Sequence, residues 1–201
     1  KEEIEDKDVE IWLEPETEHG HFHPGEEARL KLCKGYSMQP LITASLKDPR
    51  VYWGQEGNVE EIKFSAESGD INLVKVADGL VTVWAHESGE PNLYAKVIVE
   101  VGHHHHHGVK PVGLPLEITP LDYSHVHLGD KYRFQVLKEG KPLAGVEVCA
   151  TYDGSQKREY PFRITTDEEG KAEVLLMARG NWLFSVKDES TTSTFTLIKS
   201  F

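Results

Sequence analysis

The chain has 201 residues, 38% of them hydrophobic, which allows one large domain or two of about 100 residues each. Its 34 acidic and 22 basic residues give a formal net charge of -12, which argues against nucleic acid as a partner because nucleic acids attract basic surfaces. No apolar run reaches the length of about 18 residues that a membrane-spanning helix needs.

Apolar and polar residues alternate with a period of two along the chain, which predicts β-strands. The alternation is clearest over residues 28–33, 93–101, 132–136 and 182–186. Turn-forming pairs separate such runs: Asp78-Gly79, Ser88-Gly89, Glu139-Gly140, Asp153-Gly154 and Glu169-Gly170. No amphipathic helix is evident, so the pattern predicts an all-β protein built of antiparallel sandwiches.

Residues 102–112 break this alternation with a run of histidines bounded by glycine and proline. On either side the chain repeats a motif, since residues 21–29 and 125–133 both read His-x-His-x-Gly-acidic-x-x-Arg before an alternating strand. The repeat predicts two tandem immunoglobulin-like antiparallel β-sandwich domains. We expect an N-terminal domain over residues 1–102, a His-rich linker over 103–112 and a C-terminal domain over 113–201.

Several longer motifs lie at strand or loop positions: Ile11-Trp12-Leu13-Glu14-Pro15, Leu93-Tyr94-Ala95-Lys96, Gly113-Leu114-Pro115-Leu116-Glu117-Ile118-Thr119-Pro120, Gly140-Lys141-Pro142-Leu143-Ala144-Gly145-Val146, Thr165-Thr166-Asp167-Glu168-Glu169-Gly170 and Gly180-Asn181-Trp182. With them, nearly the whole chain resembles a family of bacterial and archaeal periplasmic proteins, the DUF4198-type domains associated with nickel and cobalt uptake. The C-terminal motifs are also similar to transthyretin-like and carboxypeptidase-regulatory modules.

This resemblance implies a periplasmic or other extracytoplasmic location, with any membrane anchor in a segment before residue 1. It also implies an accessory role in nickel or cobalt uptake and a membrane importer as a partner. One position departs from the pattern. Relatives often carry a histidine shortly before the tryptophan of the first strand, and Val9 stands there in this chain, so no ligand is carried over from it.

Histidines are the strongest chemical signal in the sequence, because neutral imidazole is a good ligand for nickel, cobalt, zinc and copper. The chain has 11 histidines, and all but His86 fall into three clusters. We expect His86, alone at the end of a strand, to be a surface residue. The candidate metal ligands are His19, His21, His23, His103, His104, His105, His106, His107, His125 and His127.

The first and second clusters are expected to form the strongest site together. In a seven-stranded sandwich the first and last strands end at the same pole, so the loop with His19, His21 and His23 should approach the linker that follows the last strand. The third cluster would lie at a far pole if the halves stack end to end. Two alternatives stay open: loop histidines that are merely solvated, and a histidine run that is an engineered tag.

Enzymatic motifs are absent from the sequence, including a nucleophile elbow, a phosphate-binding loop and His-Glu-x-x-His, so we expect no catalysis. The predicted function is to capture, buffer or deliver a transition metal. The alternative is a carbohydrate-binding or adhesive cell-surface module in which Trp53 and Trp84 stack on sugars. Cys33 and Cys149 lie in different halves and are expected to be partly exposed free thiols.

Overall fold

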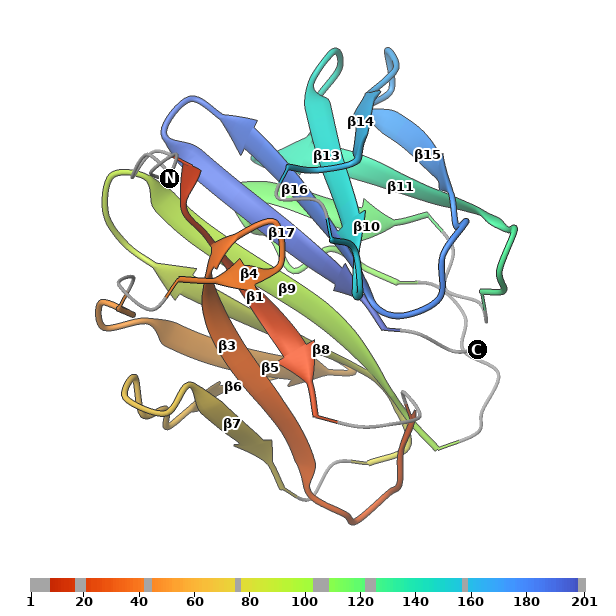
Figure 1. Cartoon of the computed structure of the whole chain (residues 1–201). Coiled ribbons are helices and arrows are strands. Elements are labelled where there is room, and N and C mark those ends of the chain that lie inside the picture. Colours follow the sequence, from red (N-terminus) through yellow and green to blue (C-terminus); the bar gives the residue numbers. More distant parts are fainter. Residues whose placement is uncertain are drawn as a thin grey trace.

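The computed structural model describes residues 8–16, 21–41, 45–74, 77–102, 109–121, 126–156 and 159–198. These residues form strands and no α-helix, which confirms the all-β class (Figure 1). No helix in these segments is long and apolar enough to cross a membrane. The strands are β1 Glu10–Pro15, β2 His21–Phe22, β3 Ala28–Tyr36, β4 Gln39–Pro40, β5 Arg50–Gln55, β6 Asn58–Ile62, β7 Asp70–Leu73, β8 Gly79–Glu87, β9 Asn92–Val101, β10 Leu116–Pro120, β11 Lys131–Lys138, β12 Lys141–Pro142, β13 Glu147–Tyr152, β14 Phe162–Thr165, β15 Lys171–Leu175, β16 Trp182–Asp188 and β17 Thr191–Leu197.

The first half of the chain, residues 8–102, packs two sheets against each other. One sheet joins β1, β3, β4 and β7, and strands β9, β8, β5 and β6 form the facing layer. The alternating positions of these strands point inward and form an aliphatic core that includes Ile11, Leu30, Ile71, Val83 and Val97. Alternation of inward and outward side chains is what the period-two pattern in the sequence predicts.

The second half, residues 109–198, repeats this order strand by strand. Strands β10, β11, β12 and β15 form one layer, and β14, β13, β16 and β17 form the other. Its core is aromatic: the Phe184 ring lies 5.1 to 6.5 Å, centroid to centroid, from the rings of Tyr132, Phe134, Trp182 and Phe195. The matching strand orders agree with the repeat that the shared histidine motif indicated.

The halves lie side by side and not end to end. Strand β17 pairs in parallel with β9, residues 191–196 against 92–97, so one sheet of nine strands runs through both halves (Figure 1). The end-to-end arrangement considered from the sequence is therefore wrong. Without this pairing, β9 and β17 would each be an edge strand with unpaired backbone N–H and C=O groups. Their pairing provides hydrogen-bond partners for the edges of both strands. The halves have separate cores and share a sheet, and their division into two domains stays a prediction.

A small apolar cluster lies between the two halves. Trp12 and Cys33 of the first half pack against Leu183 of the second, and Trp12 is fully buried. Strand β1 is therefore buried on both faces, with Ile11 and Leu13 in the first core and Trp12 turned toward the second half. This explains why Ile11, Trp12 and Leu13 are consecutive apolar residues and do not alternate with polar ones.

Candidate metal centre

The strand that carries the first histidine cluster lies beside the end of β9. Strand β17 covers β9 only as far as Val97, and β2 pairs in parallel with β9 at Glu100 and Val101. Phe22 of β2 packs into the first core, and its carbonyl oxygen accepts a hydrogen bond from the backbone nitrogen of Gly102 at 2.9 Å. Gly102 directly precedes His103, so the backbone of the first cluster adjoins the start of the second.

His23 follows this strand in an exposed turn. The backbone nitrogen of Glu26 donates to the carbonyl oxygen of His23 at 3.1 Å, and Gly25 has a φ of 79°, which favours glycine. The turn contains Pro24 and Gly25. It changes the direction of the chain after His23, before β3 begins.

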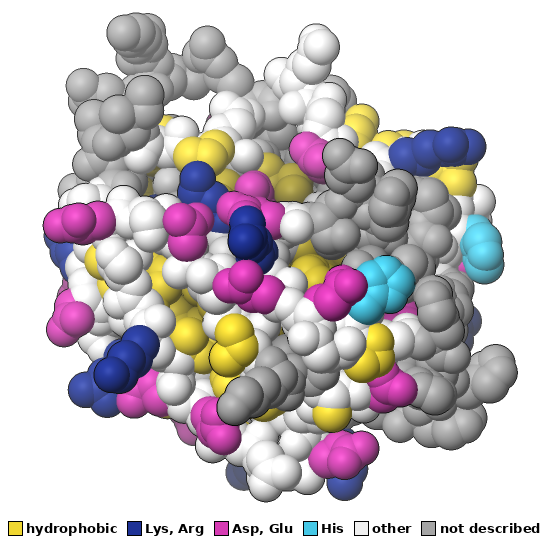
Figure 2. All heavy atoms as spheres, turned by 90° about the horizontal axis from the view of Figure 1, so that it is seen from below, with side chains coloured by type: hydrophobic (Ala, Val, Ile, Leu, Met, Phe, Trp, Pro, Cys, Tyr) yellow, Lys and Arg dark blue, Asp and Glu magenta, His cyan; other side chains and the backbone are white. Residues whose placement is uncertain are grey.

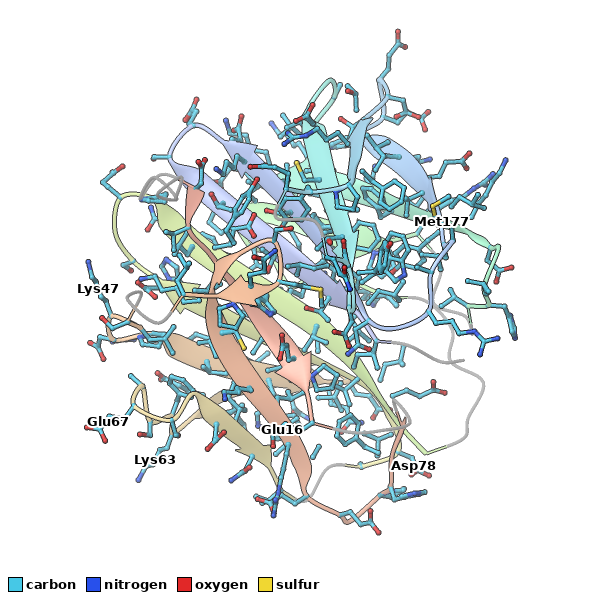
Figure 3. All side chains as sticks on the ribbon, viewed as in Figure 1. Glu16, Lys47, Lys63, Glu67, Asp78 and Met177 are labelled. Atoms are coloured by element: carbon cyan, nitrogen blue, oxygen red, sulfur yellow. The ribbon has the colours of Figure 1, made fainter. Side chains whose placement is uncertain are left out.

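Carboxylates gather at the same end of the first half. Figure 3 shows Glu16 and Asp78 close to that end. Asp78 precedes Gly79, which pairs with Val101, and the buried Glu100 lies opposite His21 in the strand register. Carboxylate oxygen is a ligand for zinc and related ions as well as an attraction for cations. Three carboxylates therefore lie on the segments that surround β2.

The third cluster lies elsewhere on the molecule. The His127 side chain is 72% exposed, and its Nδ1 atom is 3.5 Å from the Asp130 carboxylate. Asp130 closes a turn here, because its Oδ2 atom accepts a hydrogen bond from the His127 backbone nitrogen at 2.8 Å. The position of the Asp130 carboxylate beside His127 is thus explained by its role in the turn, without a metal ion.

Most of the predicted ligands fall outside the described residues: His19, His103, His104, His105, His106, His107 and His125. For His21 only the backbone is described, whereas the side chains of His23 and His127 are both exposed. Within the described segments no three His, Cys, Asp or Glu side chains form a group that could hold a metal. The histidine side chains visible in Figure 2 lie apart from one another. The complete ligand set stays a prediction.

His86 and the two cysteines are held in structural positions. His86 is half-buried and stacks on Tyr94, with ring centroids 4.3 Å apart and nearly parallel planes. Both thiols are free, as predicted, but Cys33 is buried and not partly exposed, because the second half covers its side of β3. Burial raises the pKa of Cys33 to about 12 and that of Cys149 to about 11. Protonated thiols are poor metal ligands.

A buried carboxyl group joins the two halves at Glu10. Its Oε2 atom accepts hydrogen bonds from the Tyr160 hydroxyl at 2.6 Å and the Ser37 backbone nitrogen at 3.4 Å, and its Oε1 atom accepts one from Ser185 Oγ at 2.5 Å. Burial raises the pKa of Glu10, although these donors and the charge of Lys187 oppose the shift. Four segments distant in the sequence thus meet at one carboxyl group.

A second buried carboxylate fixes the chain after the linker. Glu117 pairs with Lys96 of β9 at 2.7 Å, and both side chains are 1% exposed. Glu117 also accepts hydrogen bonds at 2.8 to 3.0 Å from the backbone nitrogens of residues 112–114. Burial lowers the pKa of Lys96, and Glu117 opposes that shift. Two of the motifs that carry the family resemblance therefore meet in one ion pair.

The buried, partnered positions of Glu10 and Glu117 were not predicted from the sequence, although their sequence neighbours indicated them. Glu10 precedes the apolar residues Ile11, Trp12 and Leu13, and Glu117 stands between Leu116 and Ile118, so each is a charged residue next to apolar ones in a first strand. Such a residue, in a strand buried on both faces, must find partners inside the protein.

The chain is similar in sequence to one protein family and in structure to several solved proteins. The sequence model described as "Domain of unknown function (DUF4198)" matches residues 82–190, more than half of the chain. No curated protein matches it. Among solved structures it is similar to the D0-D1 domain of intimin, with 18% identity, a TM-score of 0.30 and coverage of 96% of this chain and 98% of that chain.

A second similar structure is the native conformation of E. coli alpha-2-macroglobulin, with 12% identity and a TM-score of 0.34, covering 98% of this chain and 14% of that chain. A marsupial T cell receptor is similar at 9% identity and a TM-score of 0.30, over 93% of this chain and 73% of that chain. These values are too low to say anything about function.

Proposed function

We propose that this chain, which belongs to the DUF4198 family, is a non-enzymatic extracytoplasmic protein that binds nickel, cobalt, zinc or copper. The observation that carries the proposal is the pairing of β2 with the end of β9. It brings the backbone of His21 next to the segment that continues into His103. The proposal is that imidazoles from two clusters about 80 residues apart in sequence, the length of roughly one sandwich domain, share a site beside this pairing.

The chemistry of the donors suits such an ion. Three or four imidazoles from His19, His21, His23 and the run from His103 to His107 are enough for a tetrahedral site. Neutral imidazole binds late first-row metals well and binds calcium and magnesium poorly, because those ions prefer oxygen ligands. The metal is cargo in this proposal, which the protein captures, buffers or delivers to a membrane importer.

Both flanks of the histidine run are fixed relative to β9, which supports a role as a tethered ligand segment. At its start, Gly102 is bonded to Phe22 beside β9. After it, residues 112–114 donate to Glu117, which is paired with Lys96 of β9. A ligand segment tethered at both ends has a high effective concentration near its partner site.

Calorimetric titration with nickel, cobalt, zinc and copper, and with calcium and magnesium for comparison, tests the proposal. We expect binding of at least one transition metal and no binding of the two alkaline-earth ions. Replacing His103–His107 by serine, and separately replacing His19, His21 and His23 by alanine, should each weaken the binding. If the serine variant keeps both affinity and stoichiometry, the joint site is wrong.

The pH dependence gives a second readout. Metal binding requires neutral imidazole, so the affinity should fall below about pH 6 as the histidines take up protons. Titrations at several pH values measure this directly. Affinity that stays constant down to about pH 5 would point to carboxylate ligands and contradict the proposed ligand type.

A further inference from the structure

The first half presents an aromatic surface on the outer face of the nine-stranded sheet. Val81, Val83 and Ala85 of β8 belong to the first core, so Trp84 between them faces outward. On β5, the side chains alternate in the same way: Trp53 packs against the core, and its neighbour Tyr52 faces outward. Of the two tryptophans that the sequence suggested for sugar stacking, only Trp84 is on the outer face.

The half-buried rings of Trp84 and Tyr52 stack on each other. They are directly paired across β8 and β5, their ring centroids are 5.9 Å apart, and their planes differ by 22°. A Cβ atom on Gly54 would lie 3.2 Å from the Trp84 ring, so the indole lies close over the glycine backbone. Val59, paired with Gly54 from β6, extends the surface and is 59% exposed. We call Tyr52, Gly54, Val59 and Trp84 the Trp84 surface.

Polar groups border these rings. Arg50 hydrogen-bonds to Tyr52 along β5, and Glu61 is paired with Tyr52 from β6. Both are exposed. Flat rings beside a charged donor and a charged acceptor match a ligand that has an apolar C–H face and a rim of hydroxyl groups, because the rings stack on the face and the charged groups bond the rim.

We propose that the Trp84 surface binds β-linked hexopyranose units of a polysaccharide. Equatorial substituents leave such sugars with axial C–H groups that can lie flat on an aromatic ring. A protein partner fits less well, since a standard interface buries about 800 Å² on each side. The exposed large hydrophobic residues of the described segments are Val59, Val74, Leu128, Leu175 and Met177, and only Val59 lies on this surface. This site is independent of the metal-binding function.

The test measures retardation of the full chain in native gels that contain hydroxyethyl cellulose or glycogen, and tryptophan fluorescence on titration with chitohexaose. All are done with a chelator present, which removes metal effects. We expect binding to a β-linked glycan and weaker binding to α-linked glycogen. Trp84→Ala and Tyr52→Ala should each reduce affinity about tenfold, the effect of losing one aromatic contact.

Two further variants separate a binding role from a structural one. Trp84→Phe keeps a ring on Gly54 and should retain most of the affinity. Met177→Ser changes an exposed apolar side chain of the second half, far from Lys63 at the end of β6 (Figure 3), and should have no effect. Absence of binding to both β-linked glycans, or binding that Trp84→Ala leaves unchanged in a folded protein, would overturn the proposal.

Discussion

Glu10 and Glu117 occupy equivalent places in the two halves and have different partners. Each lies in the first strand of its half, opposite a residue that pairs with the proline of the short strand β4 or β12. Each is 1% exposed and contacts the other half. Glu117 has a lysine as its partner, whereas Glu10 accepts hydrogen bonds from neutral donors. At equal burial the partner decides the outcome: Glu117 is held in an ion pair with Lys96, whereas burial raises the pKa of Glu10, which no lysine of the described segments contacts directly.

The histidine motif, residues 21–29 and 125–133, also allows the two halves to be compared. Phe22 and Val126, the residues between the histidines, are both buried, each in the core of its own half. In the first half the motif forms β2, because β9 extends beyond the end of β17 and leaves a free edge. In the second half, His125, the counterpart of His21, lies outside the described residues. The turn after the motif is shared, because the Asp130 backbone nitrogen donates to the His127 carbonyl oxygen as Glu26 does to that of His23. The pairing of β2 with β9 is therefore the feature described for the first motif alone.

The largest expected effect comes from removing Glu117. Glu117→Ala leaves Lys96 buried without its counter-ion and three backbone N–H groups without their acceptor, so we expect a loss of about 3–5 kcal/mol in unfolding free energy. Urea denaturation followed by tryptophan fluorescence measures it. Glu173→Ala is the matched control, because it removes the exposed partner of Arg133 at 3.4 Å and should cost at most about 1 kcal/mol. Similar losses in the two variants would contradict the comparison.

The roles of the two histidine motifs can be distinguished by truncating the buried residue between the histidines of each, Phe22 and Val126. Phe22→Ala should cost about 3 kcal/mol, and Val126→Ala should cost less because fewer buried atoms are removed. Only Phe22→Ala loosens β2 from β9, so we expect it alone to weaken metal binding. Denaturation and metal titration on both variants check this. Equal metal affinity in the two variants would mean that β2 does not position the ligands.

Replacing Glu10 tests the second glutamate through its pH dependence. Burial raises the pKa of Glu10 above the ordinary value of 4.5. A carboxyl group with a raised folded pKa stabilises the protein fully below its unfolded pKa, and this contribution is lost as the pH rises through the folded pKa. Glu10→Gln does not titrate. The stability of the wild type relative to this variant should therefore fall as the pH rises above the ordinary carboxyl pKa of 4.5.

Exposed Glu16→Gln is the control for that series, and its stability relative to the wild type should stay nearly constant over the same range. Denaturation at each pH measures both differences. A wild-type advantage over Glu10→Gln that grows with pH would mean that the donors from Tyr160, Ser185 and Ser37 outweigh burial.

The fold was largely predictable from the sequence because it depends on local alternation. The runs at residues 28–33 and 93–101 lie within β3 and β9, and the Glu139-Gly140 pair is the turn between β11 and β12. The pairing of β9 with β17 was not predictable, because strands separated by about 100 residues carry no local record of which edges meet. The buried position of Cys33 was missed for the same reason, since the second half covers it.

The metal chemistry of the candidate site stays a prediction, because most of its histidines lie outside the described residues. The shared pole of the first and last strands predicted that the first cluster would approach the end of the last strand, and β2 does pair with the end of β9. The sequence did not indicate that β2 would complete the edge of β9, because two residues are too short for a periodic pattern. Nor could it assign partners to Glu10 or Glu117, which depend on contacts between the halves.

The smallest expected effect is that of His127→Ala. The imidazole is 72% exposed and its Nδ1 atom is 3.5 Å from Asp130, so its removal should change unfolding free energy by less than about 0.5 kcal/mol. The turn itself persists, because Asp130 bonds the backbone nitrogen of residue 127 and not its side chain. If the first two clusters hold the metal, the affinity of this variant should equal that of the wild type in the same calorimetric titration. A loss of binding in His127→Ala, with binding retained when His103–His107 are serine, would place the metal on the second half and reverse the roles of the two motifs.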